Sequence, residues 1–140
     1  MVFSPQVVTE KLLVWQDPKT GLEWQVESPG EMRWQQALDY AAALLLSGKS
    51  DWRLPALAEL ETLLDRTLAR SDGRAPMRVD VPFRDVRSYW SCTTFERDTK
   101  TAWILMFDGA YLLSYPKENR YHVRCVRGCS EQSDNVRKSG

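Results

Sequence analysis

The sequence contains no long hydrophobic run and no excess of charge of either sign. Its longest apolar stretch, Ala41 to Leu46, is far shorter than the roughly 18 residues that a membrane helix needs. Nineteen basic and nineteen acidic side chains cancel, whereas a dedicated nucleic-acid binder usually carries a strongly basic balance. We therefore expect neither insertion into a membrane nor nucleic acid as a partner.

Cysteine and glycine are also sparse. The three cysteines are too few, and odd in number, for a disulfide scaffold. The seven glycines are scattered singly, so there is no glycine-rich loop to cradle a phosphate group. Residues 1–15 lack the basic region and apolar stretch that mark a secretion signal. We expect a cytoplasmic protein, although export without a leader stays open.

The sequence does contain enough apolar material for one folded domain. Its 140 residues fit a single domain of ordinary size, and hydrophobic residues make up 43% of them, which is enough to build a core. We expect one domain over residues 1–129 and a polar, disordered tail over 130–140.

The charges are unevenly distributed along the chain. Residues 1–65 hold 5 basic and 10 acidic side chains, whereas residues 66–140 hold 14 basic and 9 acidic ones. If the second half forms one continuous face, that face attracts an anionic partner.

The first half of the chain predicts a hairpin and two helices. A strand over Leu12–Asp17, a turn over Asp17–Gly21 and a returning strand over Leu22–Val26 form the hairpin. Helical spacing then joins Trp34, Ala37, Leu38, Ala41, Leu44 and Leu45, with Gly48 as the expected C-terminal cap. Pro55 opens a second helix, whose expected buried stripe is Leu57, Leu60, Leu64 and Leu68.

The second half predicts an arginine-rich loop followed by an antiparallel meander. Residues 69–88 show little periodicity, which indicates a long loop. The expected strands are Tyr89–Phe95, Thr101–Phe107, Tyr111–Tyr115 and Tyr121–Arg127, with a hairpin turn at Asp108 and Gly109. Ala102 to Phe107 is apolar on both faces, which places it centrally in the sheet. This order of elements predicts an α+β fold, with helices segregated from an antiparallel sheet.

Six short motifs occur along this framework. They are Asp17-x-x-Thr20-Gly21-Leu22-x-Trp24, Trp34-x-x-Ala37-Leu38-x-Tyr40, Trp52-Arg53-Leu54-Pro55-x-x-x-Glu59-Leu60, Tyr89-Trp90-Ser91, Ala102-Trp103 with Phe107-x-Gly109, and Val123-Arg124-Cys125-Val126-Arg127. In this order they resemble the domain at the C-terminus of the Legionella collagen-like adhesin, a bacterial family of unknown function. That family is similar to the C-type-lectin-like superfamily, so the resemblance implies a small sheet, two helices and ligand-binding loops on one side.

The resemblance has further implications for the ligand and for the cysteines. The adhesin domain is associated with attachment to sulfated polysaccharides and with trimer formation, which implies an anionic glycan ligand and self-association. Members of the family often carry a cysteine after the tyrosine of the first helix, bridged to the cysteine of the last motif. Here Ala41 occupies that position, so Cys125 lacks this partner.

Most residues of these motifs are interpreted as structural. Arg53 is expected to pair with a carboxylate such as Glu59, because buried arginine ion pairs more often hold registry than perform chemistry. Asp17 is interpreted as a turn residue, because the further oxygen ligands that calcium needs are missing at motif spacing. Core positions are expected for Trp52, Leu54, Trp90, Trp103 and Phe107.

Catalytic and metal sites are weakly supported. Cys92, His122, Cys125 and Cys129 have the right side chains for zinc, but His122 and Cys125 are three residues apart on an expected strand and point to opposite faces. A Cys92–His122 dyad is a weaker alternative, because no motif flanks a nucleophile. No pair of carboxylates stands out for glycoside cleavage. We therefore expect no metal and no cofactor.

A binding surface is the better supported kind of site. The expected loop and the last hairpin are the most exposed segments, and they carry tyrosine for rigid contact area and arginine for forked donors. The candidate ligand-binding residues are Arg84, Arg87, Tyr111, Tyr115, Lys117, Asn119 and Arg120. Packing and protection of an exposed strand edge would also explain these residue types.

The sequence thus favours a non-enzymatic binding module, without metal, for a protein or an anionic glycan. Two alternatives stay open. One is a hydrolase with unidentified carboxylates, and the other is a structural subunit of a bacterial or phage assembly that forms homo-oligomers through the same surface. A deep pocket with convergent carboxylates would favour the enzyme, whereas an exposed patch would favour binding.

Overall fold

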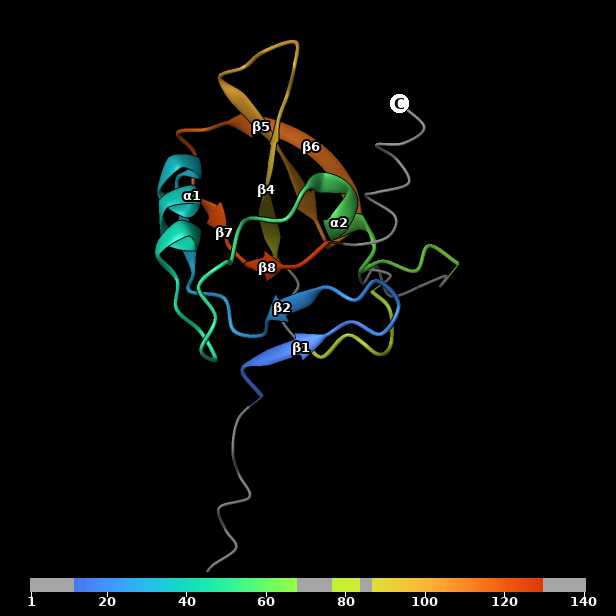
Figure 1. The fold of residues 1–140 in the computed structure, drawn as a ribbon. Helices are drawn as coiled ribbons and strands as arrows, with labels where there is room; N and C mark the ends of the chain where they lie inside the picture. Colours follow the sequence, from blue (N-terminus) through green and yellow to red (C-terminus); the bar gives the residue numbers. More distant parts are fainter. Residues whose placement is uncertain (1–11, 68–76, 84–86, 130–140) are drawn as a thin grey trace, which may run out of the picture.

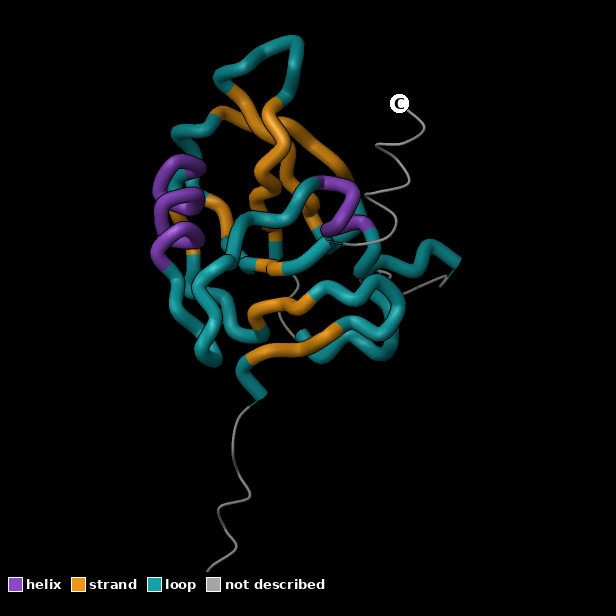
Figure 2. The backbone as a smooth tube through the Cα atoms, in the orientation of Figure 1, coloured by secondary structure: helices purple, strands orange, loops and turns teal. Residues whose placement is uncertain are grey.

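The computed structural model describes residues 12–67, 77–83 and 87–129 (Figure 1). The elements in chain order are β1 (Val14–Gln16), β2 (Glu23–Gln25), β3 (Glu31–Met32), α1 (Trp34–Ala43), α2 (Leu57–Glu61), β4 (Ser88–Thr94), β5 (Thr101–Met106), β6 (Tyr111–Pro116), β7 (Tyr121–His122) and β8 (Val126–Arg127). The strands form two sheets, in the orders β1-β2-β8 and β3-β7-β4-β5-β6. Long irregular connections join many of these elements, including the connection from α1 to α2 (Figure 2).

The α+β class expected from the sequence is confirmed, and the C-type-lectin-like assignment stays a prediction. The expected tail over 130–140 lies outside the described residues, as do Leu68 and Arg84. Within the described ranges, neither helix has the length and apolar character to cross a membrane.

The N-terminal hairpin forms as expected. β1 and β2 pair antiparallel, with Trp15 opposite Trp24. The Gly21 N–H donates to the carbonyl of Asp17, and the Asp17 N–H donates to the carbonyl of Leu22, both at 2.8 Å. Gly21 adopts a φ of 81°, a left-handed conformation that glycine accepts without steric cost. The turn is therefore closed on both sides, and it directs the Asp17 side chain inward.

The first helix ends earlier than the pattern indicated. α1 begins as expected but stops well before Gly48, and Leu45 is 71% exposed rather than buried. Gly48 and Ser47 adopt left-handed φ values of 76° and 54° in a tight turn that bridges Leu46 to Lys49. Two consecutive left-handed residues favour a two-residue hairpin turn. The glycine therefore belongs to this turn and does not cap the helix.

The second helix is also shorter than expected. α2 covers five residues, and Leu60 and Leu63 are the fully buried leucines in and after it. Leu64, expected on the helical stripe, instead forms a backbone bridge with Met77. The Arg78 N–H donates to the Leu63 carbonyl at 2.9 Å. The backbone after α2 thus finds partners in residues 77–83 rather than in a further helical turn.

β4, β5 and β6 form the expected antiparallel meander, but the last segment does not extend it. β7 lies on the other side of β4, where it pairs in parallel with β4 and antiparallel with β3. β8 pairs with β2 in the other sheet. The expectation of one continuous strand over Tyr121–Arg127 is wrong, because only its two ends, β7 and β8, are strands and they belong to different sheets. The residues between them, Val123, Arg124 and Cys125, are buried where the chain passes from one sheet to the other. The larger sheet is mixed rather than purely antiparallel.

Two buried clusters fill the interior. One contains Trp24 and Phe107, and the other contains Trp90 and Ile104. Ile104 and its neighbour Leu105 belong to different clusters, so β5 is covered on both faces, as its sequence indicated. The expected core positions are confirmed for Trp52, Leu54, Trp90 and Phe107, whereas Trp103 is only partly buried.

Arg124 connects the two sheets from inside the protein. Its guanidinium donates to the carbonyls of Gln25 and Val26, at the end of β2, and to the hydroxyl of Tyr89 in β4. The guanidinium carbon also lies 3.9 Å from the centroid of the Phe83 ring. Hydrogen bonds and the aromatic face thus offset the cost of burying this charge.

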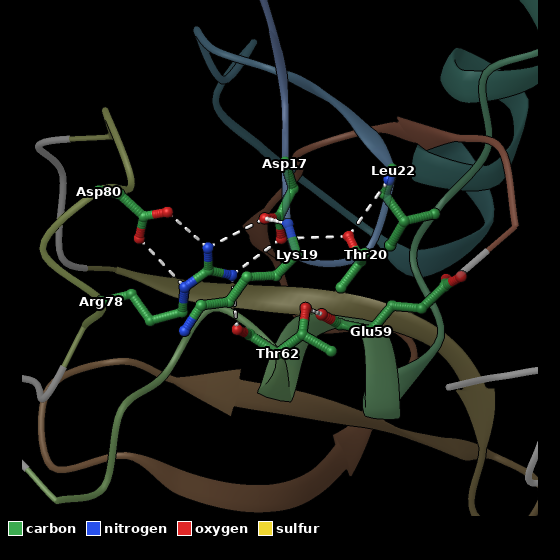
Figure 3. Close-up of polar contacts among 8 residues, drawn as sticks. All are labelled: Asp17, Lys19, Thr20, Leu22, Glu59, Thr62, Arg78 and Asp80. Carbon is green, nitrogen blue, oxygen red and sulfur yellow. Dashed lines mark hydrogen bonds and ion pairs between the residues drawn. The ribbon is translucent and has the colours of Figure 1, made fainter. Parts of the chain in front are cut away.

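Residues 77–83, expected to belong to a long loop, pack into the protein through a buried arginine. The guanidinium of Arg78 makes paired hydrogen bonds to Asp17, at 2.8 and 2.9 Å, and to Asp80, at 3.1 and 2.6 Å (Figure 3). A fifth bond, at 3.1 Å, reaches the carbonyl of Thr62. All five N–H donors of the guanidinium therefore have acceptors. Residues 77–83 contain no helix or strand, as expected of a loop, but the sequence does not predict their burial, because no local periodicity reveals a partner 61 residues away.

The Asp17 carboxylate is held in its ionised form. Burial would raise its pKa, but hydrogen bonds from Arg78, from the Lys19 backbone and from the Thr20 hydroxyl outweigh burial and lower the pKa below its ordinary value. Because the pKa of Asp17 is lowered on folding, the ion pair stabilises the fold fully at pH values above the unfolded-state pKa of about 3.9. This contribution is lost as the pH falls through the lower pKa of the folded state.

Replacing Asp17 by Asn tests the weight of this ion pair. Asp17→Asn keeps the size of the side chain but removes one of the two carboxylates, Asp17 and Asp80, that are paired with Arg78. Arg78 is only 6% exposed. We expect a loss of about 3 kcal/mol in the free energy of unfolding at pH 7. Urea unfolding measures it, and the difference from the wild type should shrink below about pH 4.

The matched control is Asp39→Asn on the exposed side of α1. We expect this change to alter stability by less than about 0.5 kcal/mol. Equal effects of the two substitutions, or a difference that persists at low pH, would contradict the assigned role of Asp17.

Candidate functional site

Four strands of the larger sheet contribute residues to one open depression on the surface. β7 lies between β3 and β4, with His122 opposite Glu31 on one side and Tyr89 on the other. Ser88, the first residue of β4, lies opposite Met106, the last residue of β5. The depression has a volume of about 370 Å³ and is lined by Glu31, Arg87, Ser88, Met106, Asp108, Arg120, Tyr121 and His122. We call it the Arg87–Arg120 depression.

Arg87 and Arg120 supply the positive charge of this depression. Arg87 precedes β4, and its carbonyl accepts a hydrogen bond from the Phe107 N–H at 3.2 Å. Arg120 precedes β7 and follows a turn in which the Asn119 N–H donates to the carbonyl of Pro116 at 2.9 Å. Both arginines are exposed, and neither forms an ion pair with another described residue. Their guanidinium groups are available to an anionic group that enters the depression.

Two carboxylates, one histidine and the hydroxyl of Tyr121 are the other charged or titratable groups of the lining. Glu31 comes from β3 and Asp108 from the turn after β5, and both are exposed. His122 Nδ1 lies 3.8 Å from Glu31 Oε2, and the histidine side chain is 21% exposed. Its ring packs near the ring of Tyr89, with 5.7 Å between the centroids. Groups of both signs therefore line one open space.

Lys117 lies at a second depression. Its Nζ is 4.0 Å from the centroid of the Trp34 ring, which is a cation–π contact. This second depression has a volume of about 410 Å³, and its lining also includes Arg33, Gln36 and Glu118. The residues expected to form one binding surface are thus divided between two places.

The remaining candidates differ in how they relate to the first depression. The Asn119 side-chain amide donates to the hydroxyl of Tyr121 at 3.3 Å, which links it to the lining. Tyr115 is partly buried, and its ring centroid lies 5.6 Å from that of Tyr121. Tyr111 is 60% exposed at the start of the edge strand β6 and does not line the depression. Arg84 lies outside the described residues.

Sequence reasoning did not assign Glu31, Asp108 or His122 to this site. β3 and β7 are two residues long, too short to show alternation, and their pairing joins segments far apart in the chain. One signal was available, since Arg120 and His122 are two residues apart in an extended segment and such residues share a face.

A protein-family model matches residues 13–127, a range that includes every residue lining the depression. The model describes the Lcl C-terminal domain. The chain belongs to the Lcl C-terminal domain family. The resemblance carried by the six motifs is therefore confirmed at the level of the family. The family is adhesin-associated, and the match indicates no enzyme family. No curated protein matches the chain.

In this Lcl C-terminal domain, the arginine of the third motif has the structural role expected of it. Arg53 makes paired hydrogen bonds to Glu59, at 2.7 and 2.8 Å, and a third to the carbonyl of Gly128 at 2.6 Å. Glu59 also accepts a hydrogen bond from the Ala56 N–H at 2.8 Å, which caps α2. The hydrogen bonds to Glu59 raise the pKa of Arg53. The pair joins the start of α2 to the end of β8.

Cys92 and Cys125 lack the features of an activated nucleophile. Burial raises the pKa of Cys125 to about 12. Burial also raises the pKa of Cys92, despite the nearby charge of Arg53. Reactive cysteines instead have a lowered pKa, because the thiolate is the nucleophilic form. Among the residues that the structure describes, no group of three or more His, Cys, Asp or Glu could hold a metal ion.

Alkylation of the folded domain tests this description of the thiols. At pH 7.5 we expect iodoacetamide to modify the exposed Cys129 first, Cys92 more slowly, and the buried Cys125 only after unfolding. Peptide mass spectrometry follows the three sites. If Cys92 reacts faster than Cys129, its thiol is activated, and the dyad with His122 becomes the better interpretation.

Proposed function

We propose that this domain is a non-enzymatic binding module that recognises an anionic group, carried by a glycan or a protein, at the Arg87–Arg120 depression. The observation that carries the proposal is that Arg87 and Arg120 line the same open depression and form no ion pair with a described residue. Guanidinium groups present forked donors that match sulfate and carboxylate oxygens. Membership of an adhesin-associated family supports a binding role.

The rest of the lining fits a selective surface site. Met106 and Tyr121 offer apolar contact area beside the arginines, and the Asn119 amide is tied to the Tyr121 hydroxyl. Glu31 and Asp108 repel anions that approach with the wrong spacing, so they contribute specificity at some cost in affinity. We infer a modest, salt-sensitive affinity for a ligand whose anionic group enters between the two arginines.

The hydrolase alternative would assign catalysis to Glu31 and Asp108, the two carboxylates in this depression. A general acid is usually kept protonated by an enclosed, apolar environment. The Glu31 side chain is instead 56% exposed, and Asp108 is an exposed turn residue. The open site favours binding over glycoside cleavage.

Charge reversal at both arginines tests the proposed function. We expect Arg87→Glu with Arg120→Glu to weaken binding of dextran sulfate at least about tenfold, because each charge-assisted contact contributes on the order of 1.5 kcal/mol or more. Biolayer interferometry on the whole chain measures the affinity, with neutral dextran as the uncharged probe. Polyglutamate provides the carboxylate probe, so that glycan-like and protein-like anions are compared.

The matched control reverses two charges elsewhere. Arg97→Glu with Lys100→Glu changes the net charge of the protein by the same amount, but in the exposed turn between β4 and β5, at the other end of β4 from Arg87. We expect this control to retain most of the binding, and both variants to melt within about 2 °C of the wild type, since exposed substitutions have small effects on stability. Unchanged binding after reversal at Arg87 and Arg120, or equal losses in both variants, would refute the assigned site.

A further inference from the structure

The Arg87–Arg120 depression contains one histidine, His122, beside the two arginines. We propose that protonation of His122 strengthens the binding of anions at this depression, so that the domain binds them more tightly at mildly acidic pH than at neutral pH. This inference rests on the proposed function, because it concerns the regulation of the same site.

His122 is placed where its charge acts on the ligand. It lies on β7 between β3 and β4 and lines the same depression as Arg87 and Arg120. Its side chain is 21% exposed, so it is accessible to solvent while its position is fixed by the strands on both sides. An anion held between the two arginines therefore lies in the field of the imidazole.

The groups around His122 come from every element next to it. β3 contributes Glu31, with 3.8 Å between Nδ1 and Oε2. The β4 side contributes Arg87, Ser88 and the ring of Tyr89. The remaining neighbours in the lining are Met106 and Asp108, from the end of β5 and the turn after it, and Arg120 and Tyr121 beside His122.

The charges of this lining balance when His122 is neutral. Two arginines and two carboxylates then give a formal net charge of zero. Protonation of the imidazole changes this to a net charge of one positive unit, which favours an anion throughout the depression. A histidine side chain makes this change at about pH 6.5 when unperturbed.

Glu31 acts as a resident counter-charge in the absence of ligand. Its carboxylate lies within ion-pairing distance of the imidazole, 3.8 Å away, but its side chain is 56% exposed. An incoming sulfate or carboxylate competes with Glu31 for the protonated histidine. By linkage, the tighter binding at low pH must be accompanied by proton uptake when the anion binds.

The composition of the chain makes this inference directly testable. His122 is the single histidine of the sequence. Side chains of Asp and Glu titrate mostly below pH 5.5, and Cys, Tyr and Lys mostly above pH 7.5, when their pKa values are ordinary. A change in affinity between these two pH values therefore points to one side chain.

The experiment measures the affinity of the whole chain for dextran sulfate at pH 5.5 and pH 7.5, at one ionic strength. Its sulfate esters remain ionised at both values, so the probe itself does not titrate. We expect the wild type to bind roughly fivefold more tightly at pH 5.5, at the lower end of typical coupling between sites. His122→Gln should bind equally at both values.

Two further variants separate the charge of His122 from its packing. His122→Lys carries its charge at both pH values, so we expect it to bind at pH 7.5 about as tightly as the wild type does at pH 5.5. Glu31→Gln removes the competing carboxylate, so we expect tighter binding than in the wild type at both values. Thermal melting of each variant identifies any that has lost its fold.

The outcomes distinguish this inference from the proposed function. Equal binding by the wild type at both pH values, or full pH dependence in folded His122→Gln, would overturn the role of His122 and leave the binding site intact. No binding of dextran sulfate or polyglutamate at either pH would overturn the proposed function itself. Loss of pH dependence in both His122 variants, with restored affinity in the lysine variant, supports the inference.

Discussion

The buried ion pair between Arg78 and Asp17 is the interaction on which the arrangement of this protein depends most. It joins the turn of the N-terminal hairpin to residues 77–83, and its bond to the carbonyl of Thr62 adds the end of α2. Removing two charges from water is costly, and such a pair is stable only when the remaining donors and acceptors are also satisfied. Asp80 completes this condition by accepting the last two donors of the guanidinium.

The same pair has consequences for the binding surface. It fixes residues 77–83 against the protein, which brings Phe83 into the core beside Trp24 and under Arg124. Arg124 in turn bonds the hydroxyl of Tyr89, whose ring packs near the imidazole of His122. A chain of packed and hydrogen-bonded side chains therefore supports the floor of the Arg87–Arg120 depression from the interior. At the surface of the depression, Arg87 and Arg120 form no ion pair with a described residue, whereas the buried Arg78 is paired with Asp17 and Asp80.

Local patterns in the sequence predicted the elements whose contacts are local. The Asp-Pro and Gly signals of the first turn, the helical spacing from Trp34 and the Asp108-Gly109 turn each depend on neighbours in the chain, and each element forms. The Arg53–Glu59 pair was also predictable, because its two residues are only six positions apart in the chain and Glu59 lies in the first turn of α2. The six motifs indicated the family, because their order along the chain is more specific than any single motif.

Features that depend on distant partners could not be predicted in this way. The register that places His122 between Glu31 and Tyr89 involves strands of two residues, which carry no periodic signal. Burial of Arg78 depends on a carboxylate 61 residues away. Five of the seven candidate binding residues do not line the depression or lie outside the described residues, because exposure alone does not determine which side chains converge.

Amide hydrogen exchange with and without dextran sulfate tests most directly whether anions bind at the Arg87–Arg120 depression. The proposed site predicts slower exchange at residues 87–89 and 120–122 when the ligand is present, with little change in the turn over residues 96–100. Protection confined to residues 33–36 and Lys117, around the second depression, would contradict this assignment and place the anion beside Trp34.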